Sequence, residues 1–250
     1  MSKVAATRLA IVLGAILLLE AACRFGLISP LTLIAPSAMA IELARLLAAG
    51  ALWGMMARTF ATIALAFALS VVLGFAAGLV IHALPRLRRA VEPLLAAYYG
   101  VPVFVFYPLL VALFGLSIVP LVIIGAAFGL AAMTISTVSG LDRVPQVLLK
   151  LARVHHLSRT GEVFLVILPA ATPYLFTGVK LALAYSFIGV LAGEFILSNG
   201  GLGFAISDAY DSFETNRMYA LMLFVLVLAI ALNMMLHLWE RRLMARRRRL

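Results

Sequence analysis

The sequence predicts an all-α integral membrane protein with about six transmembrane helices, forming a single domain over residues 1–250. Of the 250 residues, 65% are hydrophobic and only 12% are charged, whereas a soluble domain is about half apolar and a quarter charged. A helix needs roughly 20 mostly apolar residues to cross about 30 Å of hydrocarbon. Six windows approach this length; they lie at about 9–25, 59–83, 100–117, 120–138, 177–197 and 218–238.

The basic residues predict that both termini lie in the cytoplasm. Six spans place the termini on one side of the membrane, and 15 of the 20 Lys and Arg residues fall on that side, in the tails and in the segments after the second and fourth windows. Cytoplasmic loops of membrane proteins carry such an excess of basic residues. The basic run near the C-terminus therefore favours contact with anionic membrane lipids over binding to nucleic acid.

The N-terminal part predicts a span followed by a short helix on the outer membrane surface. A signal peptide is the alternative for the first window, because a basic start and an apolar core precede "LEAAC"; Glu20 and the five later windows favour a span. In "APSAMAIELARLLAAG" the helix is expected to start at Pro36, with Ser37 as its N-cap, and to end at Gly50. Arg24 is the expected helical partner of Glu20.

The second window carries Gly74 and Gly78 with GxxxG spacing. Small residues at this spacing allow another helix to approach closely in a membrane. Because glycine is common in spans, the spacing could also have no packing role.

Irregular and polar residues in the third and fourth windows are candidates for a membrane pathway. Tyr99, Pro102 and Tyr107 interrupt the third window. Broken helices line pathways in many membrane proteins, but aromatic residues also pack or anchor, so both interpretations stay open. Ser136 in the fourth window could face a pathway, although a bond to its own helix backbone, as for the neighbouring threonines, is favoured.

Glu194 is a carboxylate in the apolar fifth window, where a charge is costly and faces protein or water. A salt bridge near the membrane interface, for instance with Arg58 or Arg217, is the favoured interpretation. A direct part in gating or in the passage of a solute is the alternative.

The interval between the fourth and fifth windows, about 140–176, is polar and predicted to be cytoplasmic. "PQVLLKLARVHHLSR" (145–159) has helical spacing, and the apolar run "VFLVIL" (163–168) is too short to span a membrane. Pro169 and Pro173 disfavour helix in the residues before them. We therefore expect a helix, a buried apolar stub, a sharp break and a new helix near Thr177. A long solvated loop is the alternative, but such loops are uncommon without a function, so a partner-binding element is favoured.

The sequence lacks the signatures of an enzyme or a metal site. It has no HExxH, no phosphate-binding GxxxxGK[ST] loop and no CxxC, and the single Cys23 excludes an internal disulfide framework. The four histidines have no Asp partners at motif spacing. We therefore expect no catalytic residue, no bound metal and no cofactor in this chain.

The polar interval resembles the "EAA" cytoplasmic loop of permease subunits of binding-protein-dependent ABC importers. The family pattern is Glu-Ala-Ala, three residues, Gly, nine residues and then Ile-x-Leu-Pro. Lys150-Leu151-Ala152 takes the place of Glu-Ala-Ala, His156 the place of the Gly, and Val166-Ile167-Leu168-Pro169 the last four positions. The spacing, the second Ala and the Leu-Pro match, whereas the Glu and the Gly do not.

The flanking segments resemble the nitrate/sulfonate/taurine branch of the same family. They are "IAPSAM" (34–39), "EPLLAAYYGVPVFVFYPLLVALFGL" (92–116), "LPAATPYLFTGVKLALAYSFIGVLAGEF" (168–195) and "NGGLGFAISDAYDSFETNRMYA" (199–220). The resemblance implies a type I ABC importer permease fold in the bacterial inner membrane.

The resemblance also implies partners and roles. The loop over 148–169 would dock on a separate ATPase, which uses ATP and Mg. A second permease copy would form a homodimer with this chain and complete the pathway. A periplasmic or lipid-anchored solute-binding protein would deliver a small solute such as nitrate, a sulfonate or taurine. The residues assigned to coupling are Leu148, Lys150, Ala152, Arg153, His156, Arg159, Leu168 and Pro169. Lys150 in place of Glu and His156 in place of Gly imply either complementary changes in the ATPase or altered coupling.

Three alternative functions remain. The same importer type could carry a vitamin precursor. An ion-coupled secondary transporter would be expected to have ionisable residues near the membrane midplane and an internal repeat, neither of which is found. A membrane enzyme would need a convergent catalytic constellation, which the histidine positions do not supply.

Overall fold

The computed structural model describes residues 3–100 and 102–247, and within them every regular element is helical. The chain divides into two compact units, Met1–Arg58 with Gly200–Leu232 and Thr59–Asn199 with Asn233–Leu250. Four of the described helices are long and apolar enough to cross a membrane. They extend over Trp53–Ala83, Ile118–Asp142, Arg159–Ile196 and Thr215–Arg241. The prediction of an all-α membrane protein is confirmed.

The first unit contains α1 (Lys3–Arg24), α2 (Pro36–Ala48) and α10 (Leu202–Asp211), together with the start of α11 (Thr215–Arg247). Its core is apolar and is formed by Leu52, Ala205, Ile206 and Leu221. The predicted outer helix is present as α2, and Gly50, with φ of +73°, follows its end.

The N-terminus of α2 is capped by a residue of α1. The prediction that Ser37 is the N-cap is wrong, because Ala35 occupies that position. Ser37 instead donates to the Glu20 carboxylate from its backbone N–H (3.0 Å) and from its hydroxyl (2.6 Å). Arg24 Nε also donates to Glu20 at 2.6 Å, as predicted. A negative charge at this position satisfies free N–H groups and complements the helix dipole.

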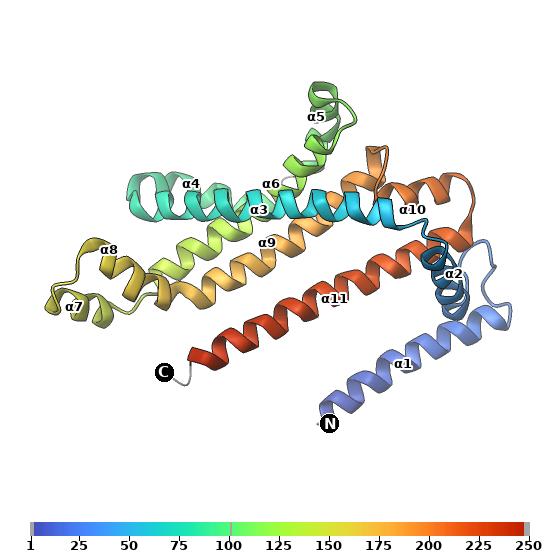
Figure 1. Cartoon of the computed structure of the whole chain (residues 1–250), viewed down its shortest axis with the longest axis horizontal. Coiled ribbons are helices and arrows are strands. Elements are labelled where there is room, and N and C mark those ends of the chain that lie inside the picture. The colour runs from blue at the N-terminus through green and yellow to red at the C-terminus, as the bar shows by residue number, and fades with distance from the viewer. Residues whose placement is uncertain (1–2, 101, 248–250) are drawn as a thin grey trace. The chain divides into compact units, whose positions relative to one another are not determined.

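The second unit is built on α3 (Trp53–Ala83), α6 (Ile118–Asp142) and α9 (Leu168–Leu197), of which α6 and α9 lie side by side (Figure 1). Glycines allow the close approach of α3 and α6. A Cβ at Gly78 would lie 2.5 Å from Thr137 Cβ, and one at Gly74 would lie 2.7 Å from Met133 Cβ. Thr134 Oγ1 also donates to Gly74 O at 3.2 Å. The packing role of the GxxxG pair is confirmed.

The third predicted span, 100–117, is not a continuous helix. It contains the short 3₁₀ turn Val103–Phe106 and α5 (Tyr107–Phe114), and it follows α4 (Pro85–Ala97) and the turn Tyr98–Gly100. Pro102 and Pro108 each remove a backbone donor, which shortens the helical segments. Gly115, with φ of +68°, then turns the chain, and Ser117 caps α6 by accepting from Val119 N at 3.3 Å.

The interval predicted to be cytoplasmic forms α7 (Gln146–Val154), α8 (Arg159–Glu162) and a π-helical turn, η3 (Val163–Ile167), that leads into α9. The predicted break at Pro169 and new helix near Thr177 are wrong, because α9 begins at Leu168 and continues through Pro173. Pro169 lies in the first turn of α9, directly after the wider π turn, where a missing N–H is tolerated. The break instead falls between α7 and α8.

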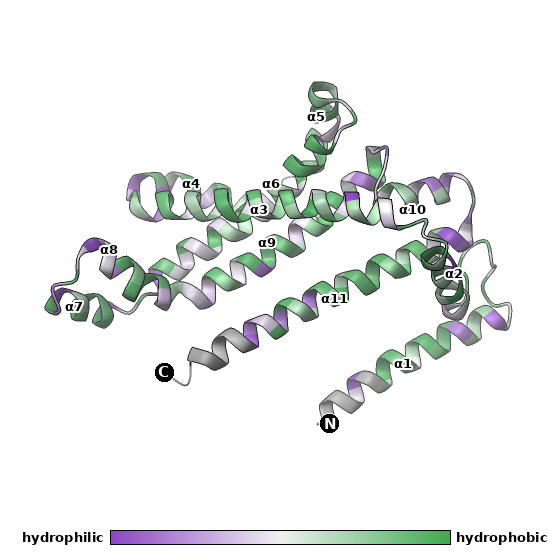
Figure 2. Cartoon of the chain, viewed as in Figure 1, coloured by the Kyte–Doolittle hydropathy of each residue, from purple (hydrophilic) through white to green (hydrophobic). Residues whose placement is uncertain are grey.

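The C-terminal part of α11 is joined to α9 within the second unit. Lys180 Nζ lies 2.8 Å from Glu240 Oε2, and the rings of Phe176 and Trp239 meet edge to face with centroids 5.7 Å apart. Figure 2 shows hydrophobic residues along α3 and α9, with hydrophilic residues at the turn between α7 and α8. This turn is therefore the polar feature that needs a functional explanation.

Candidate functional site

The end of α7 forms a tight turn that reverses the chain. Leu157 N donates to Ala152 O and His156 N donates to Arg153 O, both at 3.0 Å. These are the two hydrogen bonds of a Schellman motif, in which the residue after the C-cap adopts a left-handed conformation. That residue is His156, with φ of +51°. Ser158 then starts α8 by accepting from Gly161 N at 3.1 Å.

His156 therefore occupies a position that suits glycine. A side chain in the left-handed region costs roughly 1–2 kcal/mol because its Cβ approaches the next carbonyl oxygen. The sequence comparison with the "EAA" pattern placed a family glycine at this residue, and the positive φ gives the physical reason for that glycine. The helical spacing predicted over 145–159 therefore does not extend to His156, because α7 ends at Val154.

Large apolar side chains of this loop are exposed. Val147 and Val154 of α7 are 73% and 72% exposed, and Phe164 and Leu165 of the π turn are each 68% exposed. The prediction that the run 163–168 is buried is therefore wrong for its first three residues, which are all exposed. Exposed apolar groups that project from a polar loop are typical of a partner interface.

An open groove of about 650 Å³ separates α7 from the start of α9. Ala152, only 3% exposed, forms its floor on the α7 side. Of the predicted coupling residues, the groove brings together Leu148, Ala152 and Pro169. The basic candidates Lys150, Arg153 and Arg159 are exposed and do not line it, and Leu168 is half-buried. This hairpin thus presents an apolar surface with basic groups beside it.

The pathway candidates of the third window have different environments. Tyr107 is 2% exposed and packs with Leu121 and Ile124. Pro102 is exposed and precedes the second 3₁₀ turn. The side chain of Tyr99 lies outside the part of the chain that the structure describes. Tyr107 therefore belongs to the core of its unit.

Ser136 and Glu194 do not belong to a common site. Ser136 is half-buried against Gly178, where an added Cβ would lie 2.7 Å from Ser136 Cβ. Glu194 is 16 residues further along α9, which corresponds to about 24 Å at the helical rise. The predicted back-bonding is present at the neighbouring threonines: Thr134 and Thr137 donate to Leu130 O and Met133 O, each at 2.8 Å.

Glu194 is fully buried within the second unit. Thr59 Oγ1 lies 2.9 Å from both carboxylate oxygens of Glu194, so this hydroxyl joins the start of α3 to the end of α9. Arg217, one of the two cations suggested as its partner, lies 2.9 Å from Glu214 and 3.6 Å from Asp208 in the other unit. A buried carboxylate in a span requires such hydrogen bonds, because an isolated charge there is strongly unfavourable.

A charged cluster that the sequence patterns did not reveal lies at the predicted cytoplasmic ends of α3, α4 and α6. Arg88 donates to Asp142 at 2.9 and 2.7 Å, and His82 Nδ1 lies 3.0 Å from the same carboxylate. The hydrogen bond and charge of Asp142 raise the pKa of the Arg88 guanidinium above its usual range. Separations of 54 and 60 residues hide this cluster from local motifs. Within the described residues, no group of three or more His, Cys, Asp or Glu side chains could hold a metal.

Comparison with known proteins gives a family match over most of the chain. The family described as "Binding-protein-dependent transport system inner membrane component" matches residues 70–249. The matching segment contains the α7–α8 hairpin, α6, α9 and α11.

Curated relatives have related names. A nitrate import permease protein of Leptolyngbya laminosa is 28% identical over 74% of this chain and 66% of its own length. The taurine transport system permease protein of Escherichia coli is 28% identical over 77% of this chain and 70% of its own. A Bacillus subtilis protein with the provisional name of aliphatic sulfonates transport permease is 28% identical over 88% of this chain and 79% of its own.

Proposed function

Because this chain belongs to the family of binding-protein-dependent transport system inner membrane components, we propose that it translocates a small solute in an importer driven by a separate ATPase. It is an inner membrane permease of the ABC importer type, in the branch of the nitrate, taurine and sulfonate permeases. The family assignment favours this function over an ion-coupled secondary transporter or a membrane enzyme.

The α7–α8 hairpin is the observation that supports coupling to an ATPase. Its exposed Val154 and Phe164 offer apolar area at the predicted cytoplasmic side, and about 25 cal/mol is gained per Å² of such area that a partner covers. The Schellman turn at His156 holds the two arms of the hairpin in a fixed orientation. A rigid, apolar projection of this kind can transmit the movement of an ATPase to α6 and α9, to which the hairpin is directly connected.

The basic residues of the hairpin define the complementary surface. Lys150 and Arg153 are exposed beside the apolar face. Exposed charges steer association and set partner specificity more than they add affinity. The proposed ATPase therefore carries carboxylates opposite Lys150, where the family pattern has Glu on the permease.

The solute we propose is a small anion or zwitterion. Relatives are named for nitrate, taurine and, in Synechococcus elongatus, bicarbonate. A solute-binding protein would deliver it to the outer side, and a second copy of this chain would complete the pathway. ATP and Mg would bind to the ATPase subunits, and this chain would hold no cofactor.

Site-specific photocrosslinking tests the docking role. A photoreactive phenylalanine analogue is placed at Val154 or at Phe164, and at Ala83 as a control, since Ala83 is exposed at the end of α3 and lies outside the loop. Irradiation of native membranes should join the first two positions, but not the third, to an ATPase subunit identified by mass spectrometry.

Two results would contradict the proposal. If an ATPase co-purifies but neither loop position crosslinks to it, the hairpin is not the coupling element. If the control position crosslinks as efficiently as the loop positions, the contact is not specific to this surface.

A further inference from the structure

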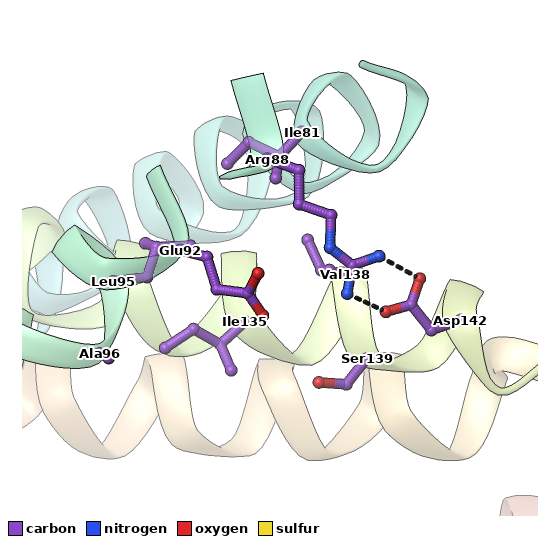
Figure 3. A pocket seen from close by; sticks show the side chains of 9 residues that line it. All are labelled: Ile81, Arg88, Glu92, Leu95, Ala96, Ile135, Val138, Ser139 and Asp142. Carbon is purple, nitrogen blue, oxygen red and sulfur yellow. Dashed lines mark hydrogen bonds and ion pairs between the residues drawn. The ribbon is translucent and has the colours of Figure 1, made fainter. Parts of the chain in front are cut away.

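A second pocket lies at the cytoplasmic ends predicted for α4 and α6, away from the coupling hairpin (Figure 3). Its volume is about 220 Å³. Drug-sized ligands occupy pockets of about 300–1,000 Å³, so this pocket suits a smaller group. Its apolar wall is formed by Ile135 and Val138 of α6 and by Leu95 of α4.

The cation in the pocket is already neutralised. Arg88 makes two contacts with Asp142, at 2.9 and 2.7 Å, and Figure 3 shows both. Paired guanidinium and carboxylate groups leave little net charge for a ligand. His82 Nδ1 lies 3.0 Å from Asp142 and does not line the pocket. The charge that remains in the pocket is that of Glu92.

Two hydrogen-bond acceptors line the pocket, the exposed Glu92 carboxylate and the half-buried Ser139 hydroxyl. Within the described residues, neither the Glu92 carboxylate nor the Ser139 hydroxyl makes a hydrogen bond or an ion pair at contact distance, although the charge of Glu92 acts through space on Arg88. Glu92 projects from α4 toward α6, and Ser139 lies on α6 (Figure 3). A carboxylate and a hydroxyl together suit a group with several N–H donors, such as a primary ammonium.

The position of α4 indicates where such a ligand comes from. Leu84 and Leu94 are 52% and 68% exposed, whereas Arg86 and Arg89 are exposed basic residues of the same region. A short helix with apolar and basic faces lies in the membrane interface, where its arginines attract lipid phosphates. On the predicted topology, the pocket therefore opens at the level of lipid headgroups.

We propose that this pocket binds the headgroup of an aminophospholipid of the cytoplasmic leaflet. The primary ammonium donates hydrogen bonds to Glu92 and Ser139, the exposed arginines of this region attract the phosphate, and an acyl chain follows the apolar side chains of α4. The proposal requires an ammonium that can donate hydrogen bonds. Phosphatidylethanolamine therefore binds more tightly than phosphatidylcholine, whose nitrogen carries no N–H. It does not depend on the solute or on coupling to an ATPase.

Native mass spectrometry of the full chain in detergent tests this site. The bound fraction is measured against increasing phosphatidylethanolamine, phosphatidylcholine and phosphatidylglycerol of the same acyl chains. We expect the chain to bind phosphatidylethanolamine in preference to the other two lipids. Glu92→Gln should weaken the affinity for phosphatidylethanolamine about tenfold, because it removes a charge-assisted hydrogen bond. Ser139→Ala should weaken it by a smaller factor. Glu42→Gln, which removes a carboxylate from α2, is the control and should leave it unchanged.

The other outcomes would overturn the proposal. Equal binding of the ethanolamine and choline lipids would show that no N–H donor is recognised. Unchanged binding in Glu92→Gln would place the lipid elsewhere. Displacement of the lipid by equimolar soluble phosphoethanolamine would show that the site takes a free amine. Loss of a dimer peak in Glu92→Gln, with lipid binding intact, would assign the pocket to a second copy of the chain.

Discussion

Replacing His156 by glycine should stabilise the turn between α7 and α8. His156 has φ of +51°, and its exposed side chain makes no hydrogen bond within the described residues. Removing the Cβ relieves roughly 1–2 kcal/mol of left-handed strain. Glycine also makes the unfolded chain more flexible, which costs about 0.4–1 kcal/mol. The net gain in the free energy of local opening is therefore about 0.5–1 kcal/mol, or a two- to fivefold reduction in opening.

Hydrogen exchange of the Leu157 amide measures this opening directly, because that amide donates to Ala152 O across the turn. His156→Ala is the matched control, since it removes the imidazole but keeps the Cβ. Further variants at position 156 should rank by how well each residue adopts a positive φ. Protection of the Leu157 amide should be lowest with Val, higher with Ala or His, higher again with Asn and highest with Gly. Val is β-branched and is the most strained at positive φ, whereas Asn tolerates the left-handed region. If His156→Ala protects the amide as much as His156→Gly, the side chain rather than the backbone limits the turn, and the reasoning fails.

Two further predictions concern the helix contacts of α3. Gly78→Ala should lower the free energy of unfolding by about 1–3 kcal/mol, because its Cβ would lie 2.5 Å from Thr137 Cβ. Gly54→Ala is the control, since a Cβ at Gly54 meets open space in the same helix, and it should not lower the stability. Equal melting temperatures of the two variants in detergent would contradict this prediction. Thr59→Val should cost about 1–3 kcal/mol by removing the hydroxyl that bonds the buried Glu194; unchanged thermal stability would show that this hydroxyl is not needed to hold the carboxylate.

Composition and hydropathy were sufficient to predict the fold class. Apolar runs long enough to span a membrane leave a chain few alternatives to helices, because the backbone must satisfy its own hydrogen bonds in lipid. The proline positions, in contrast, led to a wrong prediction of the helix break in the interval between the fourth and fifth windows. Proline rules describe soluble helices well, but here a π turn admits Pro169, and α9 continues past Pro173.

The candidate site was only partly visible in the sequence. Spacing identified His156 as the place of a glycine, because a Schellman turn has a fixed length and its left-handed residue a fixed position. Spacing could not identify the partner of Glu194, since Thr59 is 135 residues away. For the same reason it did not reveal the contact between Arg88 and Asp142, which depends on how α4 packs on α6.

The central claim is that this chain is the membrane subunit of an ATP-driven importer, and co-purification tests it most directly. A tagged chain is extracted from native membranes in several mild detergents, and the accompanying proteins are identified by mass spectrometry. The account predicts an ATP-binding cassette subunit that is lost on Ala152→Asp, since Ala152 is buried in the hairpin. A chain that purifies alone in every detergent, and that transports a solute on an ion gradient without ATP, would contradict it.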